Sequence, residues 1–267
     1  MTSKIAIHGA AGRMGLSIVR VLREDADAKL VGAIDRAPAA GKDVGVMAGG
    51  EPLSVLVGDD VEAGIAAADV VIDFSHPSAS LPLFERLAER GTPVVIGTTG
   101  FEPSGIEAIH RLGTKVPVVF APNYSQGVTM LFHLAARAAK LLGPGFDAEI
   151  VEMHHRLKVD SPSGTAVKLA EVVAEARGST YAETALHGRS GQVGKRTDAE
   201  IGVLALRGGD VVGEHTLFLV GPGERLELTH RATDRQIFAR GAVRAAHWVI
   251  GKKPGVYDMF DVMGVER

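Results

Sequence analysis

The feature that most constrains the fold is a strand, a glycine turn and a helix at the start of the chain. Residues 4–8 form an apolar run typical of a buried strand, and segment 9–15 (GAAGRMG) follows before a helical pattern. Gly9 permits a tight turn, Gly12 lets a pyrophosphate approach the backbone, and Gly15 allows close packing of helix on strand. The spacing is GxxGxxG rather than GxGxxG, so a dinucleotide site needs a second signal.

A second strand supplies that signal. Residues 29–34 read as a strand that ends at Asp35, which follows Gly15 by 35 − 15 = 20 residues. An acid at this spacing binds the ribose hydroxyls of a dinucleotide. Arg36 comes next, and its guanidinium pairs with a 2′-phosphate or stacks on adenine, so NADH and NADPH are both chemically suitable cofactors.

Further apolar runs continue the alternation of strands and helices. Residues 37–58 are rich in glycine and alanine and predict a long loop with one short strand near its end. Strands are then expected at 70–74, 93–96 and 116–121, with a helix at 78–90 after the first of them. This alternation predicts an open parallel sheet.

Small polar or aromatic residues follow the ends of these strands. Gly97-Thr98-Thr99 comes after one strand and Ala121-Pro122-Asn123-Tyr124 after another. Each segment alone is ordinary turn chemistry. Because an open parallel sheet binds its ligand at the carboxyl ends of its strands, four successive strand ends of this kind favour a cofactor cleft.

The least ordinary segment is 152–166 (EMHHRLKVDSPSGTA), which combines two imidazoles, two cations and a Ser-Gly-Thr turn. Alternation along a strand places His154 on one face and His155 on the other. The run 163–165 stands immediately before a helical pattern that begins at Ala166. Amides at a helix start, with a nearby cation and imidazole, suit a small carboxylate-bearing molecule.

Two plainer readings of this segment remain open. Ser and Thr beside a helix start are usually caps, and a histidine pair at a strand end is often structural or solvated. A metal site is not expected, because adjacent histidines lack the i, i+4 spacing of zinc enzymes and the chain has no HExxH and no cysteine.

Composition excludes several classes of protein. The chain has 267 residues, 46% hydrophobic and 23% charged, as in ordinary globular proteins. Zero cysteines exclude a disulfide scaffold and fit a cytoplasmic location, and no signal peptide is expected.

A net charge of −3 and a pI near 6.4 argue against nucleic-acid binding. No apolar stretch approaches the roughly 20 residues of a membrane span. The expected partners are small molecules and copies of the chain.

The second half of the chain has a different character. Strands are expected at 201–206, 211–220 and 225–230, joined by glycine turns that predict antiparallel pairing, and a helix at 234–250. The expected fold class is α/β: a Rossmann-like parallel sheet domain plus a second α+β domain with a mixed open sheet. The cofactor domain is predicted to comprise residues 1–125 and 235–267. A substrate-binding and oligomerisation domain would comprise 126–234.

Taken together, these motifs resemble the 4-hydroxy-tetrahydrodipicolinate reductase family, also called dihydrodipicolinate reductase. The resemblance rests on GAAGRMG, on GTTGF at 97–101, on APNY at 121–124 and above all on segment 152–166, and it extends nearly end to end. Position 35 is Asp where many relatives have Glu, and position 124 is Tyr where some have Phe. Both differences are mild.

The resemblance implies a role for each matching residue. His154 takes the acid/base position and Lys158 the proton-donor position. The expected substrate-binding residues are His155, Ser163, Gly164 and Thr165. The expected cofactor-binding residues are Gly9, Ala10, Ala11, Gly12, Arg13, Met14, Asp35, Arg36, Gly97, Thr98, Thr99, Ala121, Pro122, Asn123 and Tyr124.

It also implies an activity. The family reduces a cyclic unsaturated dicarboxylate on the diaminopimelate route to lysine, with loss of the 4-hydroxyl as water, and works as a homotetramer. Two alternatives remain. Another Rossmann-type dehydrogenase of amino acids or sugars would not be expected to carry the Ser-Gly-Thr run after the histidines. A non-catalytic NADP(H)-sensing protein has no need for His154 with Lys158.

Overall fold

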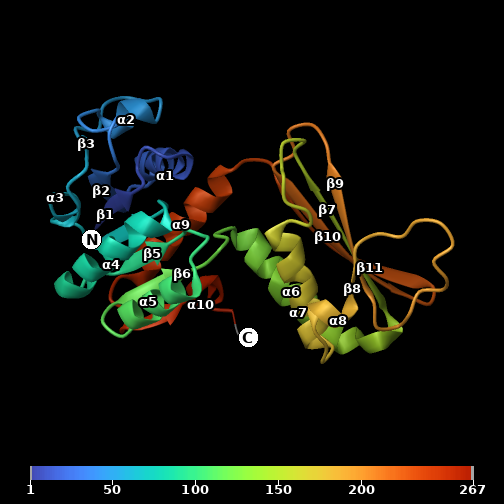
Figure 1. Ribbon diagram of the computed structural model, residues 1–267. Helices are drawn as coiled ribbons and strands as arrows, with labels where there is room; N and C mark the ends of the chain where they lie inside the picture. Colours follow the sequence, from blue (N-terminus) through green and yellow to red (C-terminus); the bar gives the residue numbers. More distant parts are fainter. Residues whose placement is uncertain (1, 266–267) are drawn as a thin grey trace. The chain divides into compact units, whose positions relative to one another are not determined.

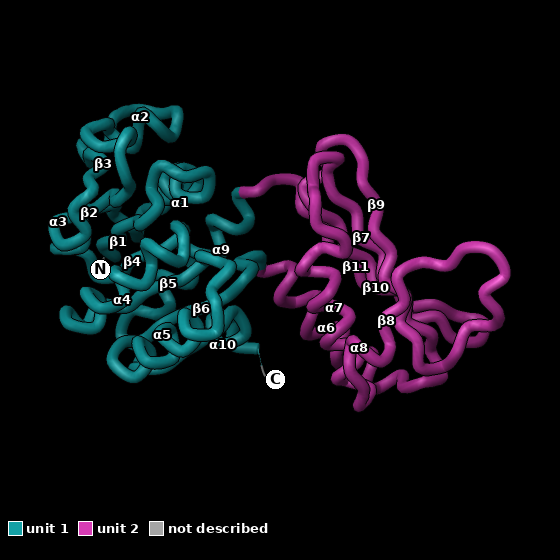
Figure 2. The backbone as a smooth tube through the Cα atoms, in the orientation of Figure 1, with its two compact units in different colours: residues 1–125, 236–266 teal, residues 126–235, 267 magenta. Residues whose placement is uncertain are grey.

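The computed structural model describes residues 2–265, and the chain divides into two compact units (Figure 2). Of the described residues, the first unit contains 2–125 and 236–265. The second unit is Gln126–Arg235. Each unit has its own sheet and its own core.

The first unit is a parallel seven-stranded sheet of order β12-β6-β5-β4-β1-β2-β3 (Figure 1). Its strands are β1 (Ser3–His8), β2 (Ala28–Ile34), β3 (Val57–Gly58), β4 (Val70–Asp73), β5 (Val94–Ile96), β6 (Pro117–Phe120) and β12 (Gly255–Tyr257). Its helices are α1 (Arg13–Glu24), α2 (Val44–Met47), α3 (Val61–Ile65), α4 (Pro77–Arg90), α5 (Pro103–Gly113), α9 (Gln236–Val249) and α10 (Met259–Met263). The predicted Rossmann-like sheet is confirmed.

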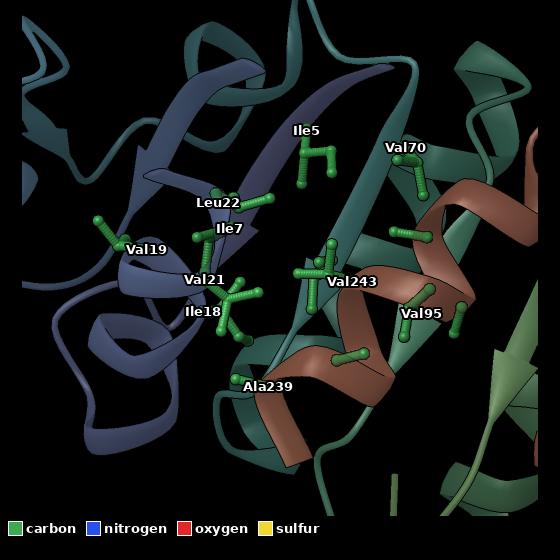
Figure 3. Packing of buried hydrophobic residues seen from close by; sticks show 14 of the residues in the cluster. Ile5, Ile7, Ile18, Val19, Val21, Leu22, Val70, Val95, Ala239 and Val243 are labelled. Carbon is green, nitrogen blue, oxygen red and sulfur yellow. The ribbon is translucent and has the colours of Figure 1, made fainter. Parts of the chain in front are cut away.

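Strand alternation divides the core of this unit between the two faces of the sheet. Ile5, Ile7 and Ile72 pack with residues of α1, α9 and α10, whereas Ala6 and Val71 pack with residues of α3, α4 and α5. Figure 3 shows the first of these clusters. Burial of each large aliphatic side chain contributes about 1.5–3 kcal/mol, so helices on both faces are required to cover the sheet.

The glycine turn has the geometry that its sequence predicts. Gly9 has φ +81°, a left-handed conformation that a side chain disfavours. A Cβ at Gly15 would lie 2.2 Å from the carbonyl oxygen of Gly9, so only glycine allows α1 to approach the turn so closely.

The second unit has a five-stranded mixed sheet of order β11-β10-β7-β9-β8. Its strands are β7 (Asp147–His154), β8 (Ala185–Leu186), β9 (Ile201–Arg207), β10 (Gly213–Gly221) and β11 (Glu224–Ala232). Its helices are α6 (Gln126–Leu142), the 3₁₀ turn η1 (Gly143–Gly145), α7 (Gly164–Ala176) and α8 (Tyr181–Thr184). Residues of α6 and α7 pack on one face against Ile150, Val203 and Leu217 (Figure 1).

One predicted strand pairing is wrong. The glycine turn at 208–210 was expected to join β9 and β10 as an antiparallel pair. Instead, β7 lies between them and pairs in parallel with β9 and antiparallel with β10. The pairing of β10 with β11 is antiparallel, as predicted. The central place of β7 puts Ile150 and Glu152 in the buried interior.

Several element boundaries also differ from expectation. The loop 37–58 contains the short helix α2, whose first amides are capped by Asp43. Helix α4 begins at Pro77 rather than at residue 78, and Pro82 lies inside it. The expected helix at 234–250 is α9, and β12 adds an edge strand that carried no sequence signal.

Gly241 provides a test of the packing of α9. Alanine is favoured over glycine by up to about 1 kcal/mol in a helix, yet a Cβ at this position would lie 1.7 Å from the carbonyl oxygen of Tyr124. Because that neighbour is backbone and cannot rotate away, we expect Gly241→Ala to destabilise the protein by on the order of 2 kcal/mol or more.

Urea unfolding followed by circular dichroism measures this change. The matched control is Gly58→Ala, where a Cβ meets nothing within 4 Å, and the free energy of unfolding should stay within about 0.5 kcal/mol of the wild type. Equal stability of the two variants would contradict the proposed clash.

Candidate active site

A cleft of about 750 Å³ lies at the carboxyl ends of the strands of the first unit. Its walls come from the glycine turn, the ends of β1 and β2, and the segment that follows β4. The lining residues are His8, Gly9, Gly12, Ile34, Asp35, Arg36, Asp59, Val61, Phe74, Ser75, His76, Ser78, Ala79 and Pro82. This is the position at which an open parallel sheet binds its ligand.

The glycine turn and Asp35 have the features that a dinucleotide requires. The N-cap of α1 is Gly12, which provides no side-chain cap, so amides of the first turn remain available to a phosphate. Asp35 Oδ2 accepts a 2.8 Å hydrogen bond from the amide of Ala11, and Oδ1 accepts one from Arg36. These bonds fix the carboxylate beside the turn, where a ribose would lie. The residues present therefore fit a nicotinamide dinucleotide.

A buried acid that sequence reasoning missed holds this cleft together. Asp73, at the end of β4, accepts hydrogen bonds from the hydroxyls of Ser75 (2.6 Å), Ser80 (2.5 Å) and Thr98 (3.2 Å). His8 Nδ1 lies 2.8 Å from Asp73 Oδ1, the oxygen that also accepts from Ser75. One carboxyl group thus ties together the end of β1, the first part of α4 and the segments that follow β4 and β5. The sequence signal that could have identified Asp73 is an acidic residue at the end of an apolar strand.

The other expected cofactor residues lie outside the lining of this cleft. Tyr124 is buried, its hydroxyl donates to the carbonyls of Ile96 (2.8 Å) and Val119 (3.1 Å), and burial raises its pKa well above the ordinary value. The remaining residues of this group are Ala10, Ala11, Arg13, Met14, Gly97, Thr98, Thr99, Ala121, Pro122 and Asn123.

In the second unit, the histidine at the end of β7 is paired with a buried glutamate. His154 Nδ1 lies 2.5 Å from Glu152 Oε2, two residues earlier on the same face of the strand. Arg207 of β9 donates to both oxygens of Glu152 at 2.9 Å, and the amide of Ser163 donates to Oε1 at 3.0 Å. The glutamate is completely buried and fully hydrogen-bonded.

These contacts set the charges of the pair. Burial disfavours ionisation of Glu152, but hydrogen bonds from Arg207, His154 and the Ser163 amide outweigh it and lower its pKa. Burial is also the main influence on His154, and together with the charges of Lys158 and Arg207 it lowers the imidazole pKa despite the opposing carboxylate. At neutral pH the glutamate is ionised and the histidine is mostly neutral.

The tautomer of His154 follows from this pairing. An ionised carboxylate only accepts hydrogen bonds, so Nδ1 carries the proton and Nε2 has the free lone pair. A Cβ at Gly213 would lie 3.0 Å from this Nε2, so glycine leaves room beside this nitrogen. The arrangement is that of a general base oriented by a carboxylate.

Three of the expected substrate-binding residues, Ser163, Gly164 and Thr165, lie at the start of α7. This helix begins at Gly164 rather than at the predicted Ala166, and Thr165 is its second residue. Ser163 is the N-cap, and its hydroxyl accepts from the amide of Ala166 at 3.2 Å. In the loop before it, Lys158 Nζ lies 2.8 Å from both oxygens of Asp160.

Two further histidines, His155 and His215, have different contacts. His155 follows the last residue of β7, and its Nε2 lies 3.2 Å from Arg235 Nη2. His215 of β10, which sequence reasoning missed, is buried with its ring 5.2 Å from that of His154, edge to face. Its Nε2 lies 3.1 Å from the hydroxyl of Ser163.

Residues 2–265 contain no cluster of three or more His, Cys, Asp or Glu that could hold a metal ion. Over the same residues, no helix is both long and apolar enough to cross a membrane.

The buried His215 predicts how stability depends on pH. Burial lowers its pKa to about 4, with the neighbouring His154 acting in the same direction, whereas an unfolded histidine titrates near 6.5. Between these values the unfolded chain binds more protons, so the free energy of unfolding should fall as the pH drops from 6.5 to 4.

Thermal unfolding of the wild type and His215→Phe at several pH values measures this effect. The variant should lose less stability than the wild type over the same interval. A parallel decline in both proteins would show that other groups control the acid sensitivity.

Comparisons with known proteins agree with this geometry. The chain matches the family models for the N-terminus of dihydrodipicolinate reductase over residues 3–124 and for its C-terminus over residues 127–263. It is 53% identical over 265 residues to 4-hydroxy-tetrahydrodipicolinate reductase of Anaeromyxobacter dehalogenans, covering 98% of each chain. The protein of the same name from Syntrophotalea carbinolica is 48% identical, with 98% and 99% covered.

Solved structures give the same result. Dipicolinate-bound dihydrodipicolinate reductase from Paenisporosarcina sp. TG-14 superposes with a TM-score of 0.76 at 26% identity, over 98% of this chain and 99% of that one. An amine dehydrogenase from Mycobacterium smegmatis, at 15% identity and a TM-score of 0.60 over 100% and 97% of the chains, shares the fold alone. The chain belongs to the dihydrodipicolinate reductase family.

Proposed function

We propose that this protein reduces 4-hydroxy-tetrahydrodipicolinate to tetrahydrodipicolinate with NADH or NADPH, with loss of water, on the diaminopimelate route to lysine. The observation that carries the proposal is the His154–Glu152 pair beside Lys158 and the start of α7, in a chain that matches the family over almost its whole length. A non-catalytic sensor of NADP(H) would need no such pair.

The substrate class follows from the second unit. The start of α7 supplies amide donors at Gly164 and Thr165, and Lys158 supplies a cation. Amides at a helix N-terminus and an ammonium are suitable partners for carboxylates. The relative from Paenisporosarcina binds dipicolinate, a planar dicarboxylate. We therefore assign a cyclic dicarboxylate to this site.

The cofactor belongs to the first unit. Amides of the glycine turn hold its pyrophosphate, Asp35 accepts from its ribose, and Arg36 offsets the repulsion between Asp35 and a 2′-phosphate. When bound, the reduced nicotinamide supplies a hydride.

His154 accepts a proton during the reaction and later returns it. Loss of the hydroxyl as water requires removal of a proton from the carbon between the hydroxyl-bearing carbon and the imine. The neutral Nε2 of His154 accepts this proton, while Glu152 stabilises the charge that develops on the ring. Reduction later requires a proton at the same carbon, which the imidazolium returns. Lys158 holds the substrate and donates a proton to the departing oxygen.

A cytoplasmic location and a homotetramer complete the proposal. The face of the second sheet opposite α6 and α7 carries exposed apolar side chains, including Leu206 (49% exposed) and Val220 (37%). Copies of the chain meeting through this face would remove that apolar surface from water. Light scattering in solution measures the mass, and a monomer at micromolar concentration would refute this part.

The activity is tested by mixing the protein with NADPH and freshly generated 4-hydroxy-tetrahydrodipicolinate and following the absorbance of the reduced nicotinamide. Oxidation that depends on this substrate supports the proposal. Oxidation only with amino-acid or sugar derivatives would favour another dehydrogenase, and cofactor binding without turnover would favour a sensor.

Substitution of His154 and Lys158 separates their roles. We expect His154→Gln to lower kcat by on the order of 10²-fold with a modest change in KM, because a proton-transfer group is lost. Lys158→Ala should lower kcat and also raise the KM for the dicarboxylate, and Lys158→Arg should restore little. Cofactor dissociation constants serve as the control and should remain unchanged. Near-normal kcat in His154→Gln would transfer the proton role to another group.

Arg36 sets the difference between the KM values for NADPH and NADH. We expect Arg36→Ala to raise the KM for NADPH several-fold more than that for NADH, because only NADPH carries the 2′-phosphate that a guanidinium binds. Steady-state kinetics with each cofactor measures the ratio. Equal losses for the two cofactors would show that Arg36 does not contact the phosphate.

A further inference from the structure

Arg207 and His154 share one oxygen of a buried carboxylate. Glu152 Oε2 lies 2.5 Å from His154 Nδ1 and accepts from Arg207 Nη1 at 2.9 Å. The two residues are register partners on the neighbouring strands β7 and β9. A guanidinium and an imidazole therefore compete for the same electron density.

We propose that Arg207 is a positioning residue that acts through Glu152 to set the basicity of His154. The guanidinium draws charge from the shared oxygen, so the carboxylate stabilises a protonated ring less than it would alone. His154 is thereby kept neutral at rest, in the state in which it accepts a proton. The assignment of a catalytic consequence rests on the proposed function, whereas the effect on the ring is a property of the unliganded protein.

The buried position of Glu152 is why this competition matters. Charge-assisted hydrogen bonds are stronger than neutral ones, and low surrounding polarity strengthens them further. Arg207 binds both oxygens of the carboxylate at 2.9 Å, which holds Oε2 in place as well as neutralising it. A single point charge would not fix the oxygen in this way.

The other charged groups around His154 do not share this oxygen. From the loop after β7, Lys158 adds a positive charge that Asp160 partly neutralises at 2.8 Å. From β10, His215 packs against the ring, and behind it His230 of β11 influences His215. The N-cap residue of α7, Ser163, contributes its amide, which donates to Oε1.

Arg207 also connects the base to the loop that carries Lys158. Its Nη2 donates to the backbone carbonyl of Asp160 at 2.7 Å, in addition to Glu152 Oε1. The same guanidinium therefore sets the state of the imidazole and fixes the chain that presents the ammonium. A purely structural arginine would have only the second effect.

The test is an NMR titration of the unliganded protein labelled with ¹³C and ¹⁵N in histidine. The His154 signal is assigned by its absence in His154→Gln. Arg207→Gln should raise the pKa of His154 by about 0.5–1 unit, because the cation and its competition are removed. Glu152→Gln should lower it, because the stabilising carboxylate is lost. The kcat/KM profile should shift in the same two directions.

Arg189→Gln is the matched control. Arg189 makes a similar double contact with Glu149, on the same strand, at 3.1 and 2.8 Å, and no histidine of residues 2–265 is bonded to that carboxylate. Its loss should leave the pKa of His154 unchanged. Shifts of the same sign in Arg207→Gln and Glu152→Gln, or no shift in Arg207→Gln, would overturn the proposal.

Removal of one member of a buried ion pair is destabilising, so Arg207→Lys is the second variant. Lysine keeps the charge but cannot bind both oxygens, and the pKa of His154 should fall between those of the wild type and Arg207→Gln. If the glutamine variant does not fold, a value at or below the wild type in Arg207→Lys overturns the proposal. The titration requires no turnover, so its result is independent of the reductase assay.

Discussion

The arrangement of the second unit depends on the burial of one ionised carboxylate. An isolated charge away from water is costly, and Glu152 is tolerated because Arg207, His154 and the amide of Ser163 surround it with donors. These donors come from β7, from β9 and from the start of α7. In the sheet, β7 lies between β9, which supplies Arg207, and β10, where His215 is the register partner of Glu152.

The first unit also contains a buried acidic residue that is held by hydrogen bonds. Asp73 is also completely buried, but its partners are three hydroxyls and an imidazole rather than a guanidinium. These partners lie at the end of β1, after β4, in the first part of α4 and after β5, so the carboxyl group joins four segments of this unit. The two acids therefore have different consequences. Asp73 shapes the cleft of the first unit, whereas Glu152 holds the imidazole of His154 in the second unit.

The sequence predicted the parts of the fold that rest on local patterns. Apolar runs identified most strands of the first sheet, and the glycine spacing identified the turn before α1. The prediction that β9 pairs with β10 was wrong because a glycine turn indicates only how neighbouring segments of the sequence connect. The place of β7 between them is decided by contacts between residues far apart in the chain. Helix α6 was not anticipated at all, although its apolar side chains, such as Leu131, pack in the core of the second unit.

The residues of the candidate site could likewise be predicted only where they stand in a local motif. His154 and Lys158 stand out in a short motif, and their roles follow from the family resemblance. Glu152 belongs to the same motif, but its role depends on Arg207, which is 207 − 152 = 55 residues away in sequence. His215 is equally remote. The expected cofactor residue Tyr124 instead donates to backbone carbonyls, because a buried hydroxyl must find a partner.

The resting charge of His154 decides the order of proton transfer under the proposed function. An imidazole whose pKa is lowered by burial starts as a base, so it cannot begin by donating to the substrate. Loss of water first places a proton on Nε2, and reduction then calls for a proton at the carbon that lost it. One group can perform both steps only if it is neutral at the start and charged in between. The Glu152–Arg207 pair meets this condition, because the carboxylate stabilises the charged ring while the guanidinium keeps that stabilisation small enough to be reversed.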